Sequence, residues 1–301
     1  MGPVAVGRVA LLAALSSVLL LVGTACGERS EPTGPASQLY PVTVPSSGGA
    51  TPLVLAKPAR RLAVIAPSVQ RILVDMGADG DVAGVPLAQN GSIVTGELRR
   101  LRPDLIVASS ATDDQTVAQA AHAVTGIPVY TAPDDSIRGV EETITDLGLI
   151  TAKQGAAVRL VREIERQRAV VSKRLAKAPI VGVFVATGFF SNLGAFTTVS
   201  SQSLIGDLLR EAHARNVAGD SPQIGPFDAR QLVRLDPRWI LATTDSGTTL
   251  EKLRKNRVTA RLGAVRAGRF VTVDAALLAP GPTIGQGLLE LARRLHPDAF
   301  R

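Results

Sequence analysis

The sequence predicts an α/β protein of two lobes with mostly parallel sheets, joined by one long spanning α-helix. Short apolar runs alternate with helical stretches in both halves of the chain, which is typical of parallel sheets covered on both faces by helices. Between the two halves lies a long amphipathic segment without a strand pattern. The 301 residues, of which 46% are apolar, are enough for two such domains.

The first lobe is expected to span residues 40–148. It opens with a hairpin, because β-rich runs at 40–44 and 51–55 flank the turn-forming sequence Pro-Ser-Ser-Gly-Gly-Ala. The elements that follow alternate, with strands predicted at 62–66, 81–85, 104–109 and 127–132 and helices at 69–76, 96–101 and 116–124.

The spanning helix is expected within residues 149–178. Thr151 and Gln154 form a capping-box pattern, apolar residues then recur at helical spacing as far as Leu175, and Pro179 ends the run. A helix of this length would extend roughly 40 Å, which suits a strut between two lobes.

The second lobe is expected to span residues 179–301, where the α/β alternation starts again. Strands are predicted at 180–186, 239–244 and 269–273, and helices at 203–212 and 284–295.

The first 25 residues have the pattern of a signal peptide. An apolar run at 9–22 is too short to span a membrane comfortably, and the only cysteine of the chain, Cys26, follows it. The run Leu-Val-Gly-Thr-Ala-Cys resembles a bacterial lipobox, with Gly23 where Leu is preferred. We therefore expect residues 26–39 to be a lipidated cysteine and a flexible tether, which anchors the protein on the outer, extracytoplasmic face of the cell membrane. A soluble secreted form remains an alternative, since Gly23 and Ala25 also suit the ordinary signal peptidase.

Composition and missing motifs exclude several functions. The net charge is +7, but Lys and Arg are scattered and aromatic residues are 3%, so no nucleic-acid partner is expected. The hydrolase, metalloprotease and phosphate-loop motifs are missing, so we expect no enzyme and no cofactor. The three histidines share no ligand spacing, which argues against a directly bound metal ion. The acidic pairs at 113–114 and 134–135 fit solvated loops.

Six stretches in order along the chain resemble a known family, the substrate-binding lipoproteins of ABC importers for ferric siderophores, haem and cobalamin. They are residues 40–68, 69–85, 98–109, 204–220, 227–243 and 270–300. The resemblance implies two Rossmann-like lobes joined by a rigid helix, with the ligand in the cleft between them. It also implies a monomer that passes a metal chelate, in the first place a ferric siderophore, to an importer permease. Haem and cobalamin remain alternative ligands.

Positions for ligand contact follow from the rule that open α/β sheets bind ligands beyond the carboxyl ends of their strands. Tyr130 has two interpretations, a contact to haem iron or a chelate, or a tyrosine packed under a loop. One of the adjacent Phe189 and Phe190 is expected to face the ligand. The full predicted set is Ser68, Ser109, Ser110, Tyr130, Thr131, Phe189, Phe190, Asn192, Thr243 and Asp274.

The predicted permease contacts depart from the pattern of the resembled family, which implies one glutamate on each lobe at the start of the helix before a proline. Counting back from Pro103 gives Gly96, with Glu97 one residue later; a one-residue gap would explain this. Counting back from Pro237 gives Arg230, with Asp228 two residues earlier. Either Glu97 and Asp228 dock instead, or Arg230 marks a lipid-anchored scaffold or sensor that kept the fold and lost the usual docking.

Overall fold

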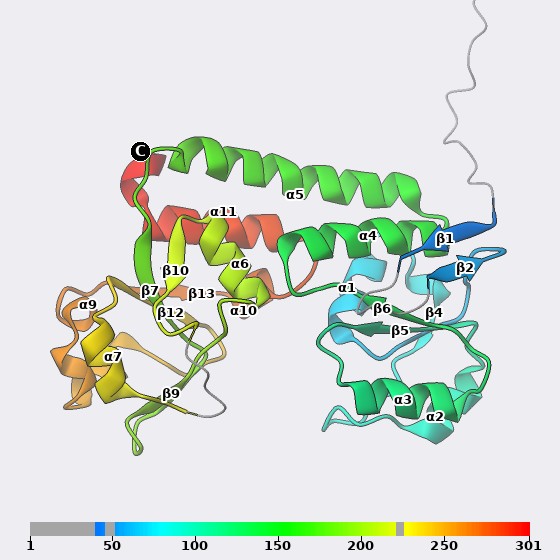
Figure 1. The fold of residues 1–301 in the computed structure, drawn as a ribbon, viewed down its shortest axis with the longest axis horizontal. Coiled ribbons are helices and arrows are strands. Elements are labelled where there is room, and N and C mark those ends of the chain that lie inside the picture. The colour runs from blue at the N-terminus through cyan, green and yellow to red at the C-terminus, as the bar shows by residue number, and fades with distance from the viewer. Residues whose placement is uncertain (1–39, 46–51, 221–225) are drawn as a thin grey trace, which may run out of the picture. The chain divides into compact units, whose positions relative to one another are not determined.

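The computed structural model describes residues 40–45, 52–220 and 226–301, and the chain from Gln38 to Arg301 forms one compact unit. This unit contains two four-stranded parallel sheets, a three-stranded antiparallel sheet and a two-stranded hairpin (Figure 1). The predicted α/β class with mostly parallel sheets is therefore confirmed. The predicted signal peptide, Cys26 and the tether lie outside the described residues. Within those residues, no helix combines the length and the apolarity needed to cross a membrane.

The predicted hairpin and the first parallel sheet are both present. The hairpin pairs β1 (Val42–Val44) with β2 (Leu53–Leu55) in antiparallel register. The sheet has the order β4-β3-β5-β6, with bounds β3 Leu62–Val64, β4 Val82–Gly84, β5 Leu105–Ser109 and β6 Val129–Ala132. Its helical connections are α1 (Pro67–Asp75), η2 (Asp79–Asp81), α2 (Thr95–Leu101) and α3 (Asp114–Ala123).

Both faces of this sheet are buried, which explains why its strands are continuously apolar. Leu62 and Val64 pack into the core on the side of α1, while the intervening Ala63 packs with Leu98 of α2 and Ala120 of α3. Alternate side chains of a strand point to opposite faces, so a strand covered by helices on both sides needs apolar residues at every position.

The second parallel sheet has the order β10-β7-β12-β13. Its strands are β7 (Val181–Ala186), β10 (Ala214–Asn216), β12 (Trp239–Thr243) and β13 (Phe270–Val273). Val183 and Val185 pack into a core with helices α6 (Leu204–Glu211), α10 (Ala275–Leu278) and α11 (Ile284–Leu295). The opposite face packs against α7 (Ala229–Leu235), α8 (Leu250–Lys255), η3 (Thr259–Arg261) and α9 (Gly263–Arg266). The described chain ends in η4 (Pro297–Phe300).

A small antiparallel sheet, β11-β9-β8, lies on the side of α7 and was not predicted. It consists of β8 (Gly188–Phe190), β9 (Ala195–Thr197) and β11 (Phe227–Asp228). Phe189 stacks on Phe196 with ring centroids 4.6 Å apart, and Phe196 meets Phe184 of β7 edge-on at 5.1 Å. These ring contacts attach the small sheet to the larger one.

The predicted spanning segment is two helices, α4 (Ile137–Thr151) and α5 (Gln154–Leu175). The predicted capping box is wrong, because Thr151 is the last residue of α4 and its hydroxyl donates to the carbonyl oxygen of Leu147 at 2.7 Å. Ala152, in the left-handed conformation, turns the chain into α5, which has no side-chain cap. Its 22 residues extend roughly 33 Å, somewhat less than predicted.

Helices α4, α5 and α6 are joined by charged contacts. The Arg168 guanidinium on α5 donates to both carboxylate oxygens of Glu211 on α6, at 2.6 and 2.9 Å, and to Glu141 on α4 at 3.0 Å. The hydrogen bonds to Glu211 are the main reason why the pKa of Arg168 is raised, and they keep its guanidinium charged. Asp207 of α6 also accepts a hydrogen bond from the backbone N–H of Ile137 at the start of α4, at 2.8 Å. The helices between the two parallel sheets are thus fixed to one another by directional contacts as well as by the core.

Candidate ligand site

Three strand ends of the first sheet converge on one carboxylate, that of Asp134. Ser68, which follows β3, donates to Asp134 Oδ2 at 3.1 Å, and Ser110, which follows β5, donates to Oδ1 at 2.6 Å. Asp134 itself lies just after β6 and is only 5% exposed. The predicted Ser68 and Ser110 are therefore brought together, and their shared partner was not among the predicted site residues.

Two adjacent acidic residues in a turn predict solvated carboxylates, and for Asp134 this prediction is wrong. Its neighbour Asp135 is indeed exposed. A signal was nevertheless available, since Asp134 occupies the carboxyl end of a strand as Ser68 and Ser110 do. Buried carboxylates normally accept several hydrogen bonds, and the hydroxyls of two neighbouring strand ends supply them here.

The other predicted hydroxyl positions of this sheet differ in access. Ser109 is buried, and its backbone N–H donates to the hydroxyl of Thr112 at 3.1 Å, closing the turn after β5. Thr131 in β6 is half-buried, whereas Ser110 is exposed. Ser110, with Ser68 beside it, thus offers the more accessible hydroxyl groups at this edge.

The position of Tyr130 agrees with the second interpretation, a packed tyrosine, and gives no support to a ligand contact. Its side chain is fully buried, and its hydroxyl donates to Asp146 Oδ2 of α4 at 2.8 Å. Burial, followed by the charge of Asp146, raises the pKa of Tyr130. Burial also raises the pKa of Asp146 to about 6, although the hydrogen bond from Tyr130 acts in the opposite direction. Tyr130 points into the core because β6 is covered by α4, so the interpretation as a packed tyrosine holds.

The strand ends of the second sheet also present hydroxyl and carboxylate groups. Thr243, at the end of β12, is buried, and its carbonyl oxygen accepts a hydrogen bond from Ser246 at 2.7 Å. Asp274, after β13, is exposed and caps α10 by accepting from the Ala276 N–H at 2.9 Å. Thr244 lies next to Asp274, since its hydroxyl accepts from the N–H of Ala275 at 3.2 Å. Thr244 and Asp274 are therefore the accessible polar pair at this edge.

Phe189, Phe190 and Asn192 belong to the β8–β9 hairpin rather than to a loop. Phe189 packs on the core, whereas Phe190, the next residue of the strand, is 43% exposed. Asn192 lies exposed in the turn. The two rings face different ways because successive side chains of a strand point to opposite sides.

The predicted docking residues lie on two matching helices, α2 and α7. Each helix has seven residues, ends at a left-handed residue (Arg102 or Asp236) and is followed by a proline and a parallel strand. Gly96 and Arg230 therefore hold equivalent positions on the two helices. Glu97 is exposed in the first turn of α2, while the carboxylate of Asp228 caps α7 through the N–H of Arg230 at 2.7 Å.

The chemistry available at these strand ends is hydrogen bonding by hydroxyl groups and by two carboxylates. Among the described residues, no three or more His, Cys, Asp or Glu side chains are placed to hold a metal ion. Hollows of about 420 and 430 Å³ lie elsewhere, the first beside α4 and α5 and the second at the junction of Pro179 with His296. The arrangement suits the binding of a ligand through hydrogen bonds.

Two parallel sheets with polar strand ends, joined through helices α4 and α5, define the class of two-lobed α/β binding proteins. The family comparison makes this specific, because residues 63–277 match the model of the family described as periplasmic binding protein. The chain belongs to this family, and it is a binding protein rather than an enzyme.

Similar proteins carry the same fold. An uncharacterized ABC transporter substrate-binding lipoprotein of Bacillus subtilis, YvrC, is 24% identical over 95% of this chain and 96% of its own length. The periplasmic heme-binding protein RhuT of Roseiflexus superposes with a TM-score of 0.65 at 17% identity, over 80% of this chain and all of its own. A protein of the ABC-type Fe3+-hydroxamate transport system of Saccharomonospora viridis has a TM-score of 0.65 at 17% identity, over 87% of this chain and 99% of its own.

Proposed function

We propose that the protein captures a ferric siderophore between its two lobes and delivers it to the permease of an ABC importer. In this proposal the chain is held on the outer face of the cell membrane by a lipid on Cys26. The observation that carries it is the pair of hydroxyl-rich strand edges, Ser68 and Ser110 around Asp134 on one sheet and Thr244 beside Asp274 on the other. The family match and the YvrC relative support the transport role.

The donors favour a chelate that brings its own metal ligands. The Thr244 hydroxyl, which accepts from the N–H of Ala275, keeps its proton to donate to an oxygen atom of an iron chelate, whereas the Ser68 and Ser110 hydroxyls donate to Asp134 and offer acceptor oxygens. The chelate fills the metal's coordination sphere, so the protein needs no metal ligands of its own. The similar Fe3+-hydroxamate protein points to the same ligand class. Haem and cobalamin are the alternatives; RhuT, which has this fold, binds haem, but the burial of Tyr130 removes the side chain that favoured haem here.

Thermal unfolding of residues 27–301 with a ligand panel tests the proposal. The panel contains ferric hydroxamate and catecholate siderophores, their iron-free forms, haem and cobalamin. A ligand at a hundred times its Kd adds about 2.7 kcal/mol to the free energy of unfolding, a shift of several degrees for a protein of this size. We expect a shift with a ferric siderophore only. A shift with haem or cobalamin alone would change the identity of the proposed ligand and leave the proposed receptor role intact. The absence of a shift with every ligand would overturn the proposal.

A matched pair of variants tests whether the siderophore binds at the edge of the first sheet that contains Asp134. Asp134→Asn weakens the acceptor that positions Ser68 and Ser110, so the Kd for the ferric siderophore should rise about tenfold. Asp135→Asn changes a neighbouring exposed carboxylate and should leave the Kd within about twofold. Equal effects of the two substitutions would refute the assignment of the site to this edge.

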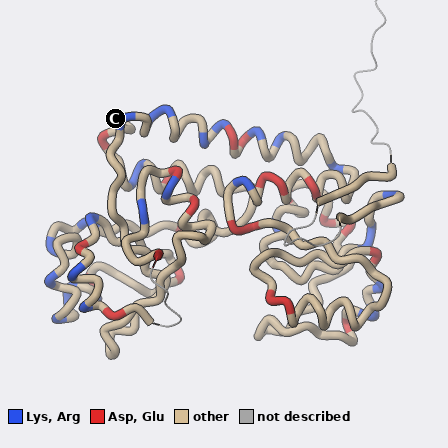
Figure 2. The backbone as a smooth tube through the Cα atoms, viewed as in Figure 1, with Lys and Arg blue, Asp and Glu red and all other residues tan. Residues whose placement is uncertain are grey.

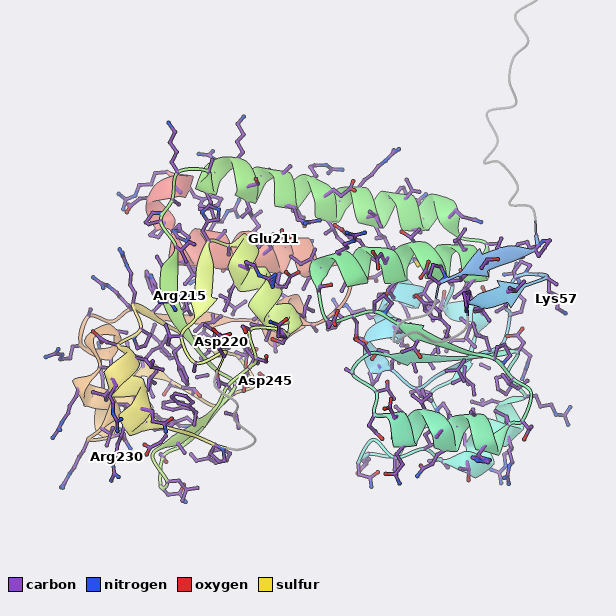
Figure 3. All side chains as sticks on the ribbon, in the orientation of Figure 1. Lys57, Glu211, Arg215, Asp220, Arg230 and Asp245 are labelled. Carbon is purple, nitrogen blue, oxygen red and sulfur yellow. The ribbon has the colours of Figure 1, made fainter. Side chains whose placement is uncertain are left out.

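The second candidate function is a lipid-anchored scaffold or sensor that has lost permease docking. It is favoured by Arg230, whose position on α7 matches that of Gly96 on α2 (Arg230 is labelled in Figure 3). A cation there reverses the sign of a contact expected to be acidic, and like charges across an interface cost affinity. Uptake of the ferric siderophore by cells separates the two functions when it is measured with the native protein and with Arg230→Glu. Uptake with the native protein, whether the variant retains or loses it, supports a working receptor. Absence of uptake with both forms supports the scaffold.

A further inference from the structure

The positive charge of the protein is concentrated in one stretch of the second lobe. Residues 229–269 contain ten Lys and Arg against three Asp and Glu, a net charge of +7 that equals the net charge of the whole chain. All ten cationic side chains are exposed. The other 260 residues are therefore balanced, and the basic character predicted to be scattered is in fact local.

The fold gathers most of these cations on one outer surface. Helices α7, α8 and α9 each contact η3, α8 also contacts α9, and the group packs against the same face of the second parallel sheet. In Figure 2 this region is crowded with Lys and Arg. We call it the basic face, formed by Arg230, Arg234, Lys252, Arg254, Lys255, Arg257, Arg261 and Arg266.

Few anionic groups compensate these cations. Among the described residues, the only ion pair of the basic face is Lys255 with Glu251, an exposed pair on α8. Lys252 donates instead to the carbonyl oxygen of Gly247 at 2.6 Å. The carboxylate of Asp228 is engaged in capping α7. The positive electrostatic potential of the basic face can therefore attract an external anion.

Two exposed apolar side chains adjoin the basic face. Phe190 is 43% exposed and Leu193 is 68% exposed, both near the tip of the β8–β9 hairpin. Hydrogen bonds fix this tip to the helices of the basic face. The Ala229 N–H at the start of α7 donates to the Gly194 carbonyl at 2.9 Å, and the Asn256 amide after α8 donates to the Ser191 carbonyl at 3.3 Å.

We infer that the basic face and the hairpin tip bind the surface of an anionic lipid bilayer. Cations facing lipid headgroups, with apolar side chains that enter the headgroup boundary, are the two components of interfacial membrane binding. A nucleic acid would be met by aromatic side chains placed among the cations for base stacking, whereas the apolar groups here lie together at one tip. The inference is independent of the proposed ligand, because no residue of the Asp134 edge takes part.

Sedimentation with lipid vesicles tests the inference on residues 27–301, which keep the whole compact unit and lack the predicted signal peptide and Cys26. The vesicles are phosphatidylcholine alone or with about 30% phosphatidylglycerol, at about 50 and 300 mM NaCl. We expect binding to the anionic vesicles only, weakened at the higher salt concentration. Each arginine near an anionic surface contributes about fivefold to the binding constant, so the triple variant R257Q/R261Q/R266Q should bind roughly 100-fold more weakly.

Matched controls decide between a specific face and simple attraction by net charge. R71Q/R100Q/R159Q removes three exposed arginines from other helices and should weaken binding less than threefold. F190S/L193S should reduce the binding that persists at high salt. Equal loss in the two arginine variants, equal binding to both vesicle types, or binding to single-stranded DNA without binding to anionic vesicles would each overturn the inference. Both arginine variants should keep the siderophore-induced shift in unfolding temperature, so this test fails or succeeds separately from the proposed function.

Discussion

The buried Asp146 makes a specific prediction about stability. This residue of α4 is only 9% exposed, its carboxylate accepts a hydrogen bond from Tyr130, and burial raises its pKa to about 6. An acid whose pKa is raised on folding binds its proton more tightly in the folded protein. Its contribution to stability is therefore fully present below the pKa of the unfolded chain, near 4, and is lost as the pH rises through about 6.

The substitution Asp146→Asn removes this titration and keeps an oxygen that accepts from Tyr130. A rise in pKa from about 4 to about 6 corresponds to at most about 3 kcal/mol, about 2 kcal/mol of it between pH 4.5 and pH 8. The neutral amide accepts a hydrogen bond about 1 kcal/mol weaker than a carboxylate does, but this loss is nearly independent of pH. The stability of the variant relative to the native protein should thus increase by about 2 kcal/mol from the lower to the higher pH.

Urea unfolding followed by far-UV circular dichroism at several pH values measures the effect. The only tryptophan, Trp239, begins a strand of the second sheet, so its fluorescence separates unfolding of that sheet from unfolding around Asp146. Asp75→Asn, at an exposed carboxylate on α1, is the control and should give a curve parallel to that of the native protein. A parallel curve for Asp146→Asn as well would refute the reasoning from burial.

Two further substitutions test the packing between helices. Arg168→Met leaves two partly buried glutamates unpaired and should lower the free energy of unfolding by about 2 kcal/mol. The control Arg166→Met removes an exposed ion pair and should change the free energy of unfolding by no more than about 0.5 kcal/mol. Similar losses for the two variants in urea unfolding would contradict the role of Arg168 in joining the three helices. Gly287→Ala places a methyl group against the carbonyl oxygen of Leu277 and should cost about 3 kcal/mol, whereas Gly155→Ala, with room around it in α5, should stabilise the protein by up to about 1 kcal/mol. An unfolding temperature of Gly287→Ala close to that of the native protein would contradict the expected clash with α10.

Much of the secondary structure could be predicted because the local pattern was strong. Strands covered on both sides by helices are apolar at each position, so β3, β5, β7 and β12 were identified within one or two residues. The closing helix α11 was predicted with its observed bounds, since its apolar residues recur at a regular helical spacing.

The wrong or missing secondary-structure predictions lie where the local sequence is compatible with two structures. Thr151 and Gln154 have the spacing of a capping box, but the same threonine also ends a preceding helix and donates to its own i−4 carbonyl. The strand that contains Phe189 and Phe190 was not predicted, because a strand of three residues has too few positions to show an alternation. Neither ambiguity can be resolved without the neighbouring element.

The sequence by itself determined the α/β class, the order of the elements and the edges at which polar side chains lie, because these depend on residue periodicity along one element. Only the tertiary structure decided which strand-end residues reach the surface. Tyr130 and Ser110 were both predicted from their places at the carboxyl ends of strands, yet α4 covers Tyr130 and leaves Ser110 exposed beside Asp134. It also decided that cations separated along residues 229–269 form one face. The excess of cations in residues 229–269 is a local property of the sequence. Burial, and the gathering of these cations on one outer surface, depend on contacts between distant segments.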